Sequence, residues 1–308
     1  MKRLTILLTM ILVAAINFPA SAANTGTKLP PTYANVPYGP DPMNVLDFWE
    51  AKGTGPRPLL VYIHGGGWTT GDKSGWSMKR CKEFLDKGIS CAAINYRLTG
   101  QAPLPAPVRD AARAIQFLRW KAKDWNIDKK RIALTGGSAG ACTSMWILCH
   151  DDLANPHAKD PVLRESTRVI AAGVNVGQTS IDPKVIETWL GPNVLKHRMI
   201  NMAVGEPTIE GALKNYAKYH DLYVEYSPYN HLTKDDPPLY MTYPDKMKLP
   251  CTSAGHGIHH PMFGIKMKEK ADHLGVECYL QIGRRTKPKK YANVDAFLID
   301  KLLHGQPQ

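Results

Sequence analysis

The sequence predicts an α/β fold of three layers, in which helices cover both faces of a mostly parallel sheet. Strand-like and helix-like segments alternate along nearly the whole chain, which is the pattern of a parallel sheet. The 308 residues suffice for one large domain, and 44% hydrophobic with 21% charged residues is ordinary for a globular protein. From about residue 183 to 230 the alternation stops, and helix-like, tyrosine-rich sequence predicts a helical cap inserted over the sheet.

Strands and helices are located by the hydrophobic pattern and by the prolines and glycines between them. A proline-rich, extended lead-in is expected at residues 28–41. The expected strands cover residues 43–50, 58–64, 89–96, 131–135, 169–176, 238–243 and 276–282. The expected helices cover residues 79–87, 108–122, 138–150, 263–274 and 294–303. In the insertion, the near-helical spacing of the tyrosines favours packing of the cap onto the sheet over an aromatic wall for a substrate.

The first 22 residues predict a signal peptide for export. Two basic residues are followed by an apolar run at residues 4–16 and by small residues around a cleavage point at 20–22. A membrane anchor is the alternative, but the run falls short of the ~20 residues that span a bilayer, and Pro19 interrupts it. We therefore expect residues 23–308 to form a secreted or periplasmic domain without a membrane span after cleavage.

The chain is basic, with a net charge of +12, but no nucleic-acid motif accompanies the charge. Lysine and arginine are scattered except for a run at residues 284–290. That run is compatible with attraction to an anionic polymer, yet a solvated loop is the simpler interpretation. We expect no nucleic-acid partner.

The six cysteines are expected to be buried thiols, because most of them stand singly in apolar segments. A disulfide between Cys81 and Cys91 is the alternative in an exported chain. The cysteines lack the spacing of metal ligands, so they predict no metal site.

The stretch GGSAG, residues 136–140, sets one serine among small residues. A strand is predicted directly before it and a helix directly after it. A serine at such a turn is held in strained backbone, with its hydroxyl clear of the sheet and near the positive end of a helix. The motif alone is a weak signal, but these flanks make Ser138 a candidate nucleophile.

The stretch HGGGW, residues 64–68, directly follows another predicted strand. Its glycines allow backbone N–H groups to approach a bound oxygen without interference from side chains. Together with the amide of Ala139, the amides of these glycines are expected to stabilise a developing oxyanion. The alternative is a glycine-rich loop that only reverses the chain. The presence of both motifs, each at the end of a strand, favours the oxyanion loop.

With these two motifs the chain resembles the alpha/beta hydrolase superfamily, specifically its esterase/lipase branch with an HGGGW oxyanion loop. The likeness extends over nearly all of the chain after the signal, through VYIHGGGWTTGDKS, AAINYRL, APVRDAARAIQFLRW, IDKKRIALTGGSAG and DDPPLYMTY. The resemblance implies the three-layer alpha/beta hydrolase sandwich, with Ser138 as nucleophile and oxyanion amides at Gly65, Gly66 and Ala139. It also implies that His64 and Asp72 shape the loop and carry no protons.

The acid and the base of a catalytic triad are less clearly marked. The resemblance places an acid after the strand at 238–243, where Asp245 is the candidate, although an aspartate beside a proline is also ordinary turn chemistry. The resemblance places a histidine after the strand at 276–282, but the sequence there has none. The later His304 lies at a helix end near the C-terminus, where a capping or solvated role is favoured.

Histidines gather instead in AGHGIHHP, residues 254–261, in a loop expected at the same edge of the sheet as Ser138. A triad is defined by geometry and not by chain order, so this loop is expected to supply the base. His259 and His260 are preferred because Pro261 and the next helix fix their backbone, and His256 is the third choice. The alternatives are a metal site, imidazoles that cap the next helix, and loss of the base.

The sequence therefore predicts an exported serine esterase that cleaves small-molecule or carbohydrate esters without a metal or organic cofactor. Trp68, at the end of the glycine loop, and Gln178, in a polar turn, are expected to contact the substrate. For Gln178, an Asx-type turn that ends the strand is an equal explanation. The alternative functions are a catalytically impaired binding protein on the same fold, a serine peptidase and an acyltransferase.

Overall fold

The computed structural model of the chain describes residues 29–305, so the predicted signal peptide lies outside the described residues. Eight strands form one sheet in the order β1-β2-β4-β3-β5-β6-β7-β8. They are β1 (Tyr33–Pro37), β2 (Val45–Trp49), β3 (Arg57–Ile63), β4 (Ser90–Ile94), β5 (Ile127–Gly137), β6 (Ala171–Asn175), β7 (Leu239–Tyr243) and β8 (Cys278–Ile282). The strands from β4 to β8 in this order run parallel to one another. At the edge beyond β4, strand β2 runs antiparallel to β4, and β1 runs antiparallel to β2.

Each predicted strand is present, as β2 to β8, but β1 lies within the lead-in that was expected to be merely extended. Four of the five residues of β1 are exposed. An exposed edge strand lacks the alternation of polar and apolar residues by which strands are recognised, which is why the sequence did not reveal β1.

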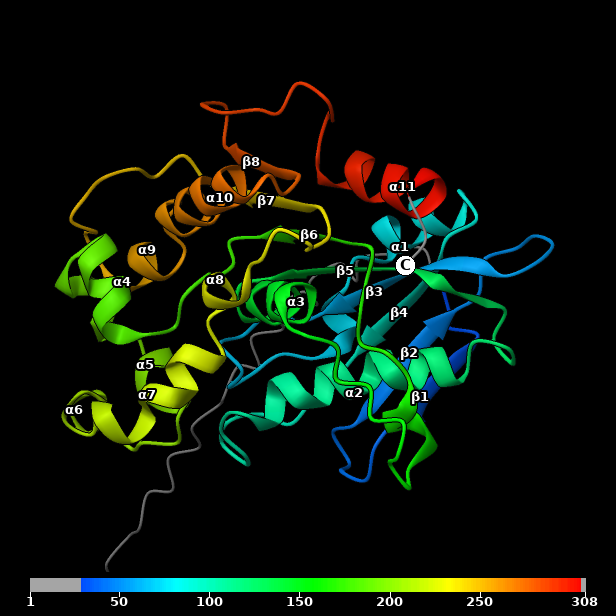
Figure 1. Cartoon of the computed structure of the whole chain (residues 1–308), viewed down its shortest axis with the longest axis horizontal. Coiled ribbons are helices and arrows are strands. Elements are labelled where there is room, and N and C mark those ends of the chain that lie inside the picture. Colours follow the sequence, from blue (N-terminus) through cyan, green and yellow to red (C-terminus); the bar gives the residue numbers. More distant parts are fainter. Residues whose placement is uncertain (1–28, 306–308) are drawn as a thin grey trace, which may run out of the picture.

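Helices cover both faces of the sheet, as the three-layer prediction requires (Figure 1). Along β3, Leu59 and Val61 join the apolar cluster that contains α2 (Ala106–Trp120), α3 (Ala139–Cys149) and α10 (Met262–Leu274). Leu60 points to the other face, where α1 (Met78–Leu85) and α11 (Val294–His304) complete a second cluster. Because successive residues of a strand point to opposite faces of the sheet, the same strand contributes side chains to two separate cores.

Between β6 and β7 the chain leaves the sheet and forms a helical insertion, seen at the left of Figure 1. It comprises α4 (Pro183–Leu190), the 3₁₀ helix η3 (Pro192–Lys196), α5 (Met199–Met202), α6 (Ile209–Lys214), α7 (Tyr216–Glu225) and α8 (Pro228–His231). Further 3₁₀ helices are η1 (Lys73–Gly75) and η2 (Pro161–Arg164), and α9 (Ala254–Ile258) lies between β7 and α10.

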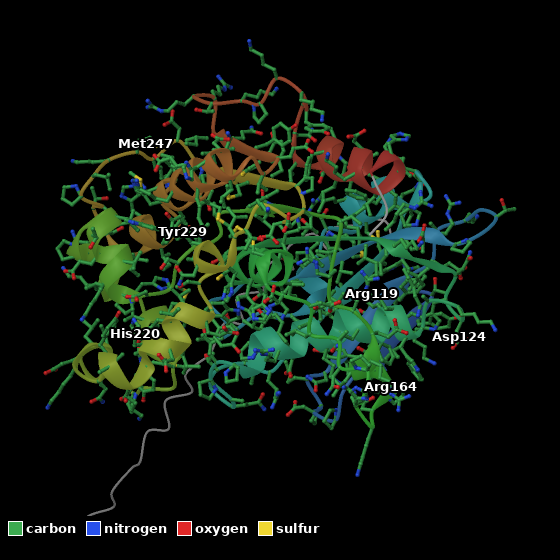
Figure 2. All side chains as sticks on the ribbon, in the orientation of Figure 1. Arg119, Asp124, Arg164, His220, Tyr229 and Met247 are labelled. Carbon is green, nitrogen blue, oxygen red and sulfur yellow. The ribbon has the colours of Figure 1, made fainter. Side chains whose placement is uncertain are left out.

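The insertion packs firmly onto the rest of the molecule. Tyr219, Tyr223 and Tyr226 are buried in the main apolar cluster, so the tyrosines serve packing, as favoured from their spacing. In Figure 2, the labelled His220 and Tyr229 mark this side of the molecule, and Arg119 and Asp124 mark the opposite side.

All six cysteines lie within the described residues and are buried free thiols, as predicted. Cys91 is not bridged to Cys81, whose carbonyl oxygen lies 3.9 Å from the Cys91 Sγ. Among the helices of residues 29–305, none has the length and apolar character that a bilayer span requires.

Gly140, in the first turn of α3, brings this helix against the end of β3. A Cβ atom at Gly140 would lie 2.1 Å from the carbonyl oxygen of Ile63 and 2.5 Å from that of His64. Backbone atoms cannot give way as a flexible side chain can. The residue therefore has to be glycine if the helix is to start where it does.

We expect Gly140→Ala to lower the free energy of unfolding by about 1–3 kcal/mol, because the added methyl group overpacks the junction between α3 and β3. The matched control is Gly100→Ala, since a Cβ atom at that exposed turn meets nothing within 4 Å. Urea denaturation of both variants measures the difference. Equal stability of the two variants would show that α3 does not depend on this close approach.

Candidate active site

Ser138 stands at the junction of β5 and α3, the position predicted from its flanking residues. Its backbone has φ 53° and ψ −122°, which is a strained conformation for a residue other than glycine. Backbone hydrogen bonds on both sides of Ser138 maintain this conformation. The Ser138 amide donates to the Asn175 carbonyl at 3.0 Å, and the Ser138 carbonyl accepts from the Cys142 amide at 2.9 Å.

The imidazole of His259 contacts the hydroxyl of Ser138, with Nε2 2.9 Å from Oγ. For the hydroxyl to donate this hydrogen bond, Nε2 must be unprotonated and the ring proton must be on Nδ1. Burial lowers the pKa of His259, which favours this neutral form at neutral pH. The arrangement is that of a nucleophile beside a general base.

His259 is placed by groups on two different elements. The amide of the Gln178 side chain, just after β6, donates to the carbonyl oxygen of Ile258 at 2.6 Å. The short helix α9, which ends at Ile258, packs on η3 of the insertion. A Cβ atom at Gly257 would lie 2.8 Å from the Cβ of Val194, which shows how close this packing is.

The structure separates the two preferred histidines. His260 is fully buried and its Nδ1 accepts the amide of Met262 at 3.0 Å, so this ring caps the start of α10 and does not face Ser138. Successive residues at this turn point in different directions, which is why only one of them reaches the serine. The capping alternative thus applies to His260.

His256, the third choice, is also engaged elsewhere. Its Nδ1 accepts the amide of Thr252 at 3.1 Å, and its Nε2 lies 2.9 Å from the carbonyl oxygen of Lys246. The three rings of the histidine loop therefore have separate partners and do not converge on one point, as a shared metal ion would require.

Asp245 is not hydrogen-bonded to His259, contrary to the triad arrangement expected for it. Its Oδ1 accepts from the Arg285 guanidinium at 2.8 Å, and both side chains are exposed. Gly283, in the turn after β8, lies directly against Asp245 and brings Arg285 within reach. Among residues 29–305 we find no hydrogen-bond acceptor for the Nδ1 of His259.

The HGGGW loop lies opposite the serine. Gly66 has φ 102°, and a Cβ atom there would lie 2.1 Å from the carbonyl oxygen of Thr70, so only glycine fits. Ala139 is the first residue of α3, where amide groups have no intrahelical acceptor. The glycine loop lies close to the serine, since a Cβ atom at Gly65 would be 3.4 Å from the Ser138 Cβ. The backbone that carries the amides of Gly65, Gly66 and Ala139 is therefore close to Ser138.

His64 and Asp72 shape this loop. The His64 ring stacks on Tyr96 at a centroid distance of 4.2 Å, and burial lowers the pKa of His64. Although burial opposes it, hydrogen bonds from Asn95 and Ser74 lower the pKa of Asp72 to about 2. Asp72 is bonded to Ser74 and Asn95, and the Nδ1 of His64 lies 2.8 Å from the carbonyl oxygen of Gly65.

The expectation that Trp68 and Gln178 contact the substrate is wrong in this structure. Trp68 is fully buried and its indole Nε1 donates to Thr143 at 3.0 Å. Gln178 is likewise buried, and its amide is used to position the segment before His259. Both side chains are hydrogen-bonded inside the protein, next to the site, and do not line it.

Two hollows meet at His259. The smaller hollow, of about 310 Å³, is lined by Gly66, Gly67, Ser138, His197, Arg198, Met199 and His259. The larger hollow, of about 800 Å³, is lined by His259 and by residues of the loop after β7, among them Asp245, Lys246, Lys248 and His256.

The insertion adds His197 and Arg198 to this site, and sequence reasoning missed both. His197 accepts the amide of Met199 on Nδ1 at 3.2 Å. Burial lowers the pKa of His197, with smaller contributions from nearby His259 and Arg198, so its neutral ring carries the proton on Nε2. No motif marks these residues, because only the folding of the insertion brings them to Ser138.

A different group of described residues has the geometry to hold a metal ion. The ligand atoms of His150, Glu225 and His231 lie within 4.8 Å of one another. However, the Arg109 guanidinium donates to Glu225 at 3.1 Å, which supplies the positive charge that the carboxylate needs. His150 follows the far end of α3, roughly 18 Å along the helix from Ser138, so this group is separate from the candidate active site.

A family model described as BD-FAE matches residues 46–249, about two thirds of the chain. The chain belongs to the BD-FAE family. This is an esterase family of the alpha/beta hydrolase superfamily, so the resemblance stated from the sequence is confirmed.

Curated relatives of this BD-FAE protein are named as ester hydrolases. A probable carboxylic ester hydrolase, LipM of Mycobacterium tuberculosis, is 30% identical over 64% of this chain and 44% of its own length. The esterase LipQ of the same organism is 33% identical over 42% of this chain and 30% of its own length. The chain thus spans less than half the length of these relatives.

Solved structures share the fold. A carbohydrate esterase from gut microbiota, in truncated form, has a TM-score of 0.65 at 20% identity, covering 81% of this chain and 86% of its own. An acetyl ester-xyloside bifunctional hydrolase from Caldicellulosiruptor lactoaceticus has a TM-score of 0.61 at 22% identity, covering 85% and 89%. Both confirm the alpha/beta hydrolase sandwich for this BD-FAE protein.

We expect the acidic limb of the pH profile of kcat/KM for this BD-FAE protein to have its midpoint below pH 6.5. The base must be unprotonated to act, and burial lowers the pKa of His259 from its ordinary value, so activity persists to lower pH. Initial rates with a neutral ester between pH 4 and 9 measure the midpoint. A midpoint above pH 6.5 would contradict this expectation and would mean that a carboxylate stabilises the charged ring in the free enzyme.

Proposed function

We propose that this protein is a serine hydrolase that cleaves carboxylic ester bonds, with Ser138 as nucleophile and His259 as general base. The observation that carries the proposal is the 2.9 Å contact between Ser138 Oγ and His259 Nε2 at a strained turn, opposite a glycine loop. The naming of curated relatives as carboxylic ester hydrolases supports the same reaction class.

In the acylation step, Oγ of Ser138 attacks the ester carbonyl carbon while its proton passes to Nε2 of His259. The carbonyl oxygen becomes an oxyanion that accepts hydrogen bonds from the amides of Gly65, Gly66 and Ala139, an effect worth ~3–4 kcal/mol per donor. The intermediate collapses, the bond to the alcohol oxygen breaks, and His259 returns the proton to that oxygen. Water then attacks the acyl-serine by the same route and releases the acid.

For the substrate we propose acyl groups on carbohydrates, cleaved outside the cytoplasm. The predicted signal peptide supports export, and carbohydrate esterases among the structures of like fold support the substrate class. The larger hollow, at about 800 Å³, is lined in part by His259 and has room for a sugar ring.

One observation favours a second function, a catalytically impaired binding protein. Asp245 is paired with Arg285, so among residues 29–305 no carboxylate is hydrogen-bonded to the ring of His259, which becomes an imidazolium during acylation. When the histidine of a catalytic triad loses its carboxylate partner, the kcat of the enzyme typically falls about 10⁴-fold.

Turnover of p-nitrophenyl acetate, followed by reaction with a fluorophosphonate and intact-mass analysis, separates the two functions. The esterase is expected to hydrolyse the ester and to gain one phosphonyl adduct, while Ser138→Ala does neither. The matched control is Ser144→Ala, because Ser144 is on the same helix but its buried hydroxyl donates to the Gly140 carbonyl at 2.7 Å. Absence of both turnover and adduct in the wild type would favour the binding protein.

A further inference from the structure

The smaller hollow, which holds Ser138 and His259, contains one charged side chain. Arg198 lines it from the insertion, just before α5, and its side chain is exposed. No aspartate or glutamate lines this hollow. None of the ion pairs among residues 29–305 involves Arg198, so its guanidinium is available to a ligand.

The neighbouring groups do not neutralise this charge. Burial lowers the pKa of both His197 and His259, so at neutral pH these rings are neutral and neither repel nor attract an anion strongly. The larger hollow adds Lys246 and Lys248, and its one acid, Asp245, is already paired with Arg285. Around the nucleophile the charge is therefore positive.

A guanidinium in this position is suited to one ligand chemistry in particular. Arginine binds a carboxylate through two parallel N–H···O bonds, which gives orientation as well as affinity. The neutral His197 ring, which carries its proton on Nε2, lies next to Arg198 in the same hollow and offers a further donor. A hollow of about 310 Å³ accommodates only a small group beside the reacting ester.

We infer that Arg198 makes this enzyme selective for esters that carry a carboxylate close to the scissile bond. The carboxylate belongs either to the acyl part, as in the half-ester of a dicarboxylic acid, or to the alcohol part, as in an acetylated uronic acid. This inference rests on the proposed esterase function and names the class of substrate for the same site.

The test compares kcat/KM for matched pairs of a charged and a neutral ester. For the acyl side the pair is p-nitrophenyl hydrogen succinate and its methyl ester. For the alcohol side the pair is acetylated galacturonic acid and acetylated galactose, with released acetate measured. We expect the charged member of one pair to be favoured about ten-fold at low ionic strength, because the contact is charge-assisted but partly exposed.

Arg198→Gln is expected to reduce that ratio to about one. The matched control is Lys196→Gln, which removes the same charge two residues away, from a side chain that does not line the hollow and donates to Asn193. The control should keep the ten-fold ratio, which separates a contact in the site from the overall field of the protein. Circular dichroism checks that both variants are folded.

The outcomes are distinguishable. If the neutral esters are hydrolysed but neither pair gives a preference, or if Arg198→Gln keeps the preference, the inference is overturned and the esterase proposal stands. If Lys196→Gln loses the preference as fully as Arg198→Gln does, Arg198 is not the selective contact. If the wild type hydrolyses neither p-nitrophenyl acetate nor any of the four esters, the proposed function fails and the inference fails with it. If it hydrolyses p-nitrophenyl acetate but none of the four esters, only the inference is overturned.

Discussion

The hydrogen bond between Ser138 and His259 joins two parts of the chain that are 121 residues apart, and the arrangement of the site depends on it. Ser138 is held rigidly by strained backbone between β5 and α3, and this placement depends on glycine at position 140. His259 is held less directly, through the bond from Gln178 to Ile258 and through the packing of α9 on η3. The serine is thus fixed by the sheet, and the histidine is fixed by the insertion together with Gln178.

This division of support gives the insertion a part in the chemistry as well as in the binding of substrate. The same helical segment that supports α9 contributes His197 and Arg198 to the hollow beside Ser138. A displacement of η3 would therefore move the base and the binding groups together. We expect substrate selection and catalysis to be linked in this protein through one structural element.

The environment of His259 differs from that of a triad histidine. No carboxylate is bonded to it among the described residues, and burial lowers its pKa. Such a ring is a weaker base but is unprotonated over a wider pH range. Stabilisation of the transition state then depends more on the oxyanion amides around Ser138, where the positive end of α3 contributes.

Features that depend on neighbouring residues could be predicted from the sequence, whereas features that depend on tertiary packing could not. The nucleophile turn and the glycine loop are set by neighbouring residues, so Ser138, Gly66 and the strands before them could be predicted. The choice between His259 and His260 depends on the direction in which each side chain leaves a short turn, which only the packing of α9 on η3 decides.

The same reasoning explains the errors. Trp68 and Gln178 stand next to the site in sequence, but their side chains turn into the core, because each has a buried partner there. Asp245 follows the expected strand, but the tight turn after β8 brings Arg285 to it, and no sequence pattern reveals that pairing.

The most direct test of the central claim is the second-order rate constant with which a fluorophosphonate modifies Ser138 in His259→Gln and in Asp245→Asn. If His259 is the base and Asp245 is paired only with Arg285, His259→Gln should react roughly 10²–10⁴-fold more slowly than the wild type. Asp245→Asn should remain within about ten-fold of the wild type, because only an exposed ion pair is lost. An equal loss in both variants would show that Asp245 acts on His259 in the working enzyme and would contradict this account.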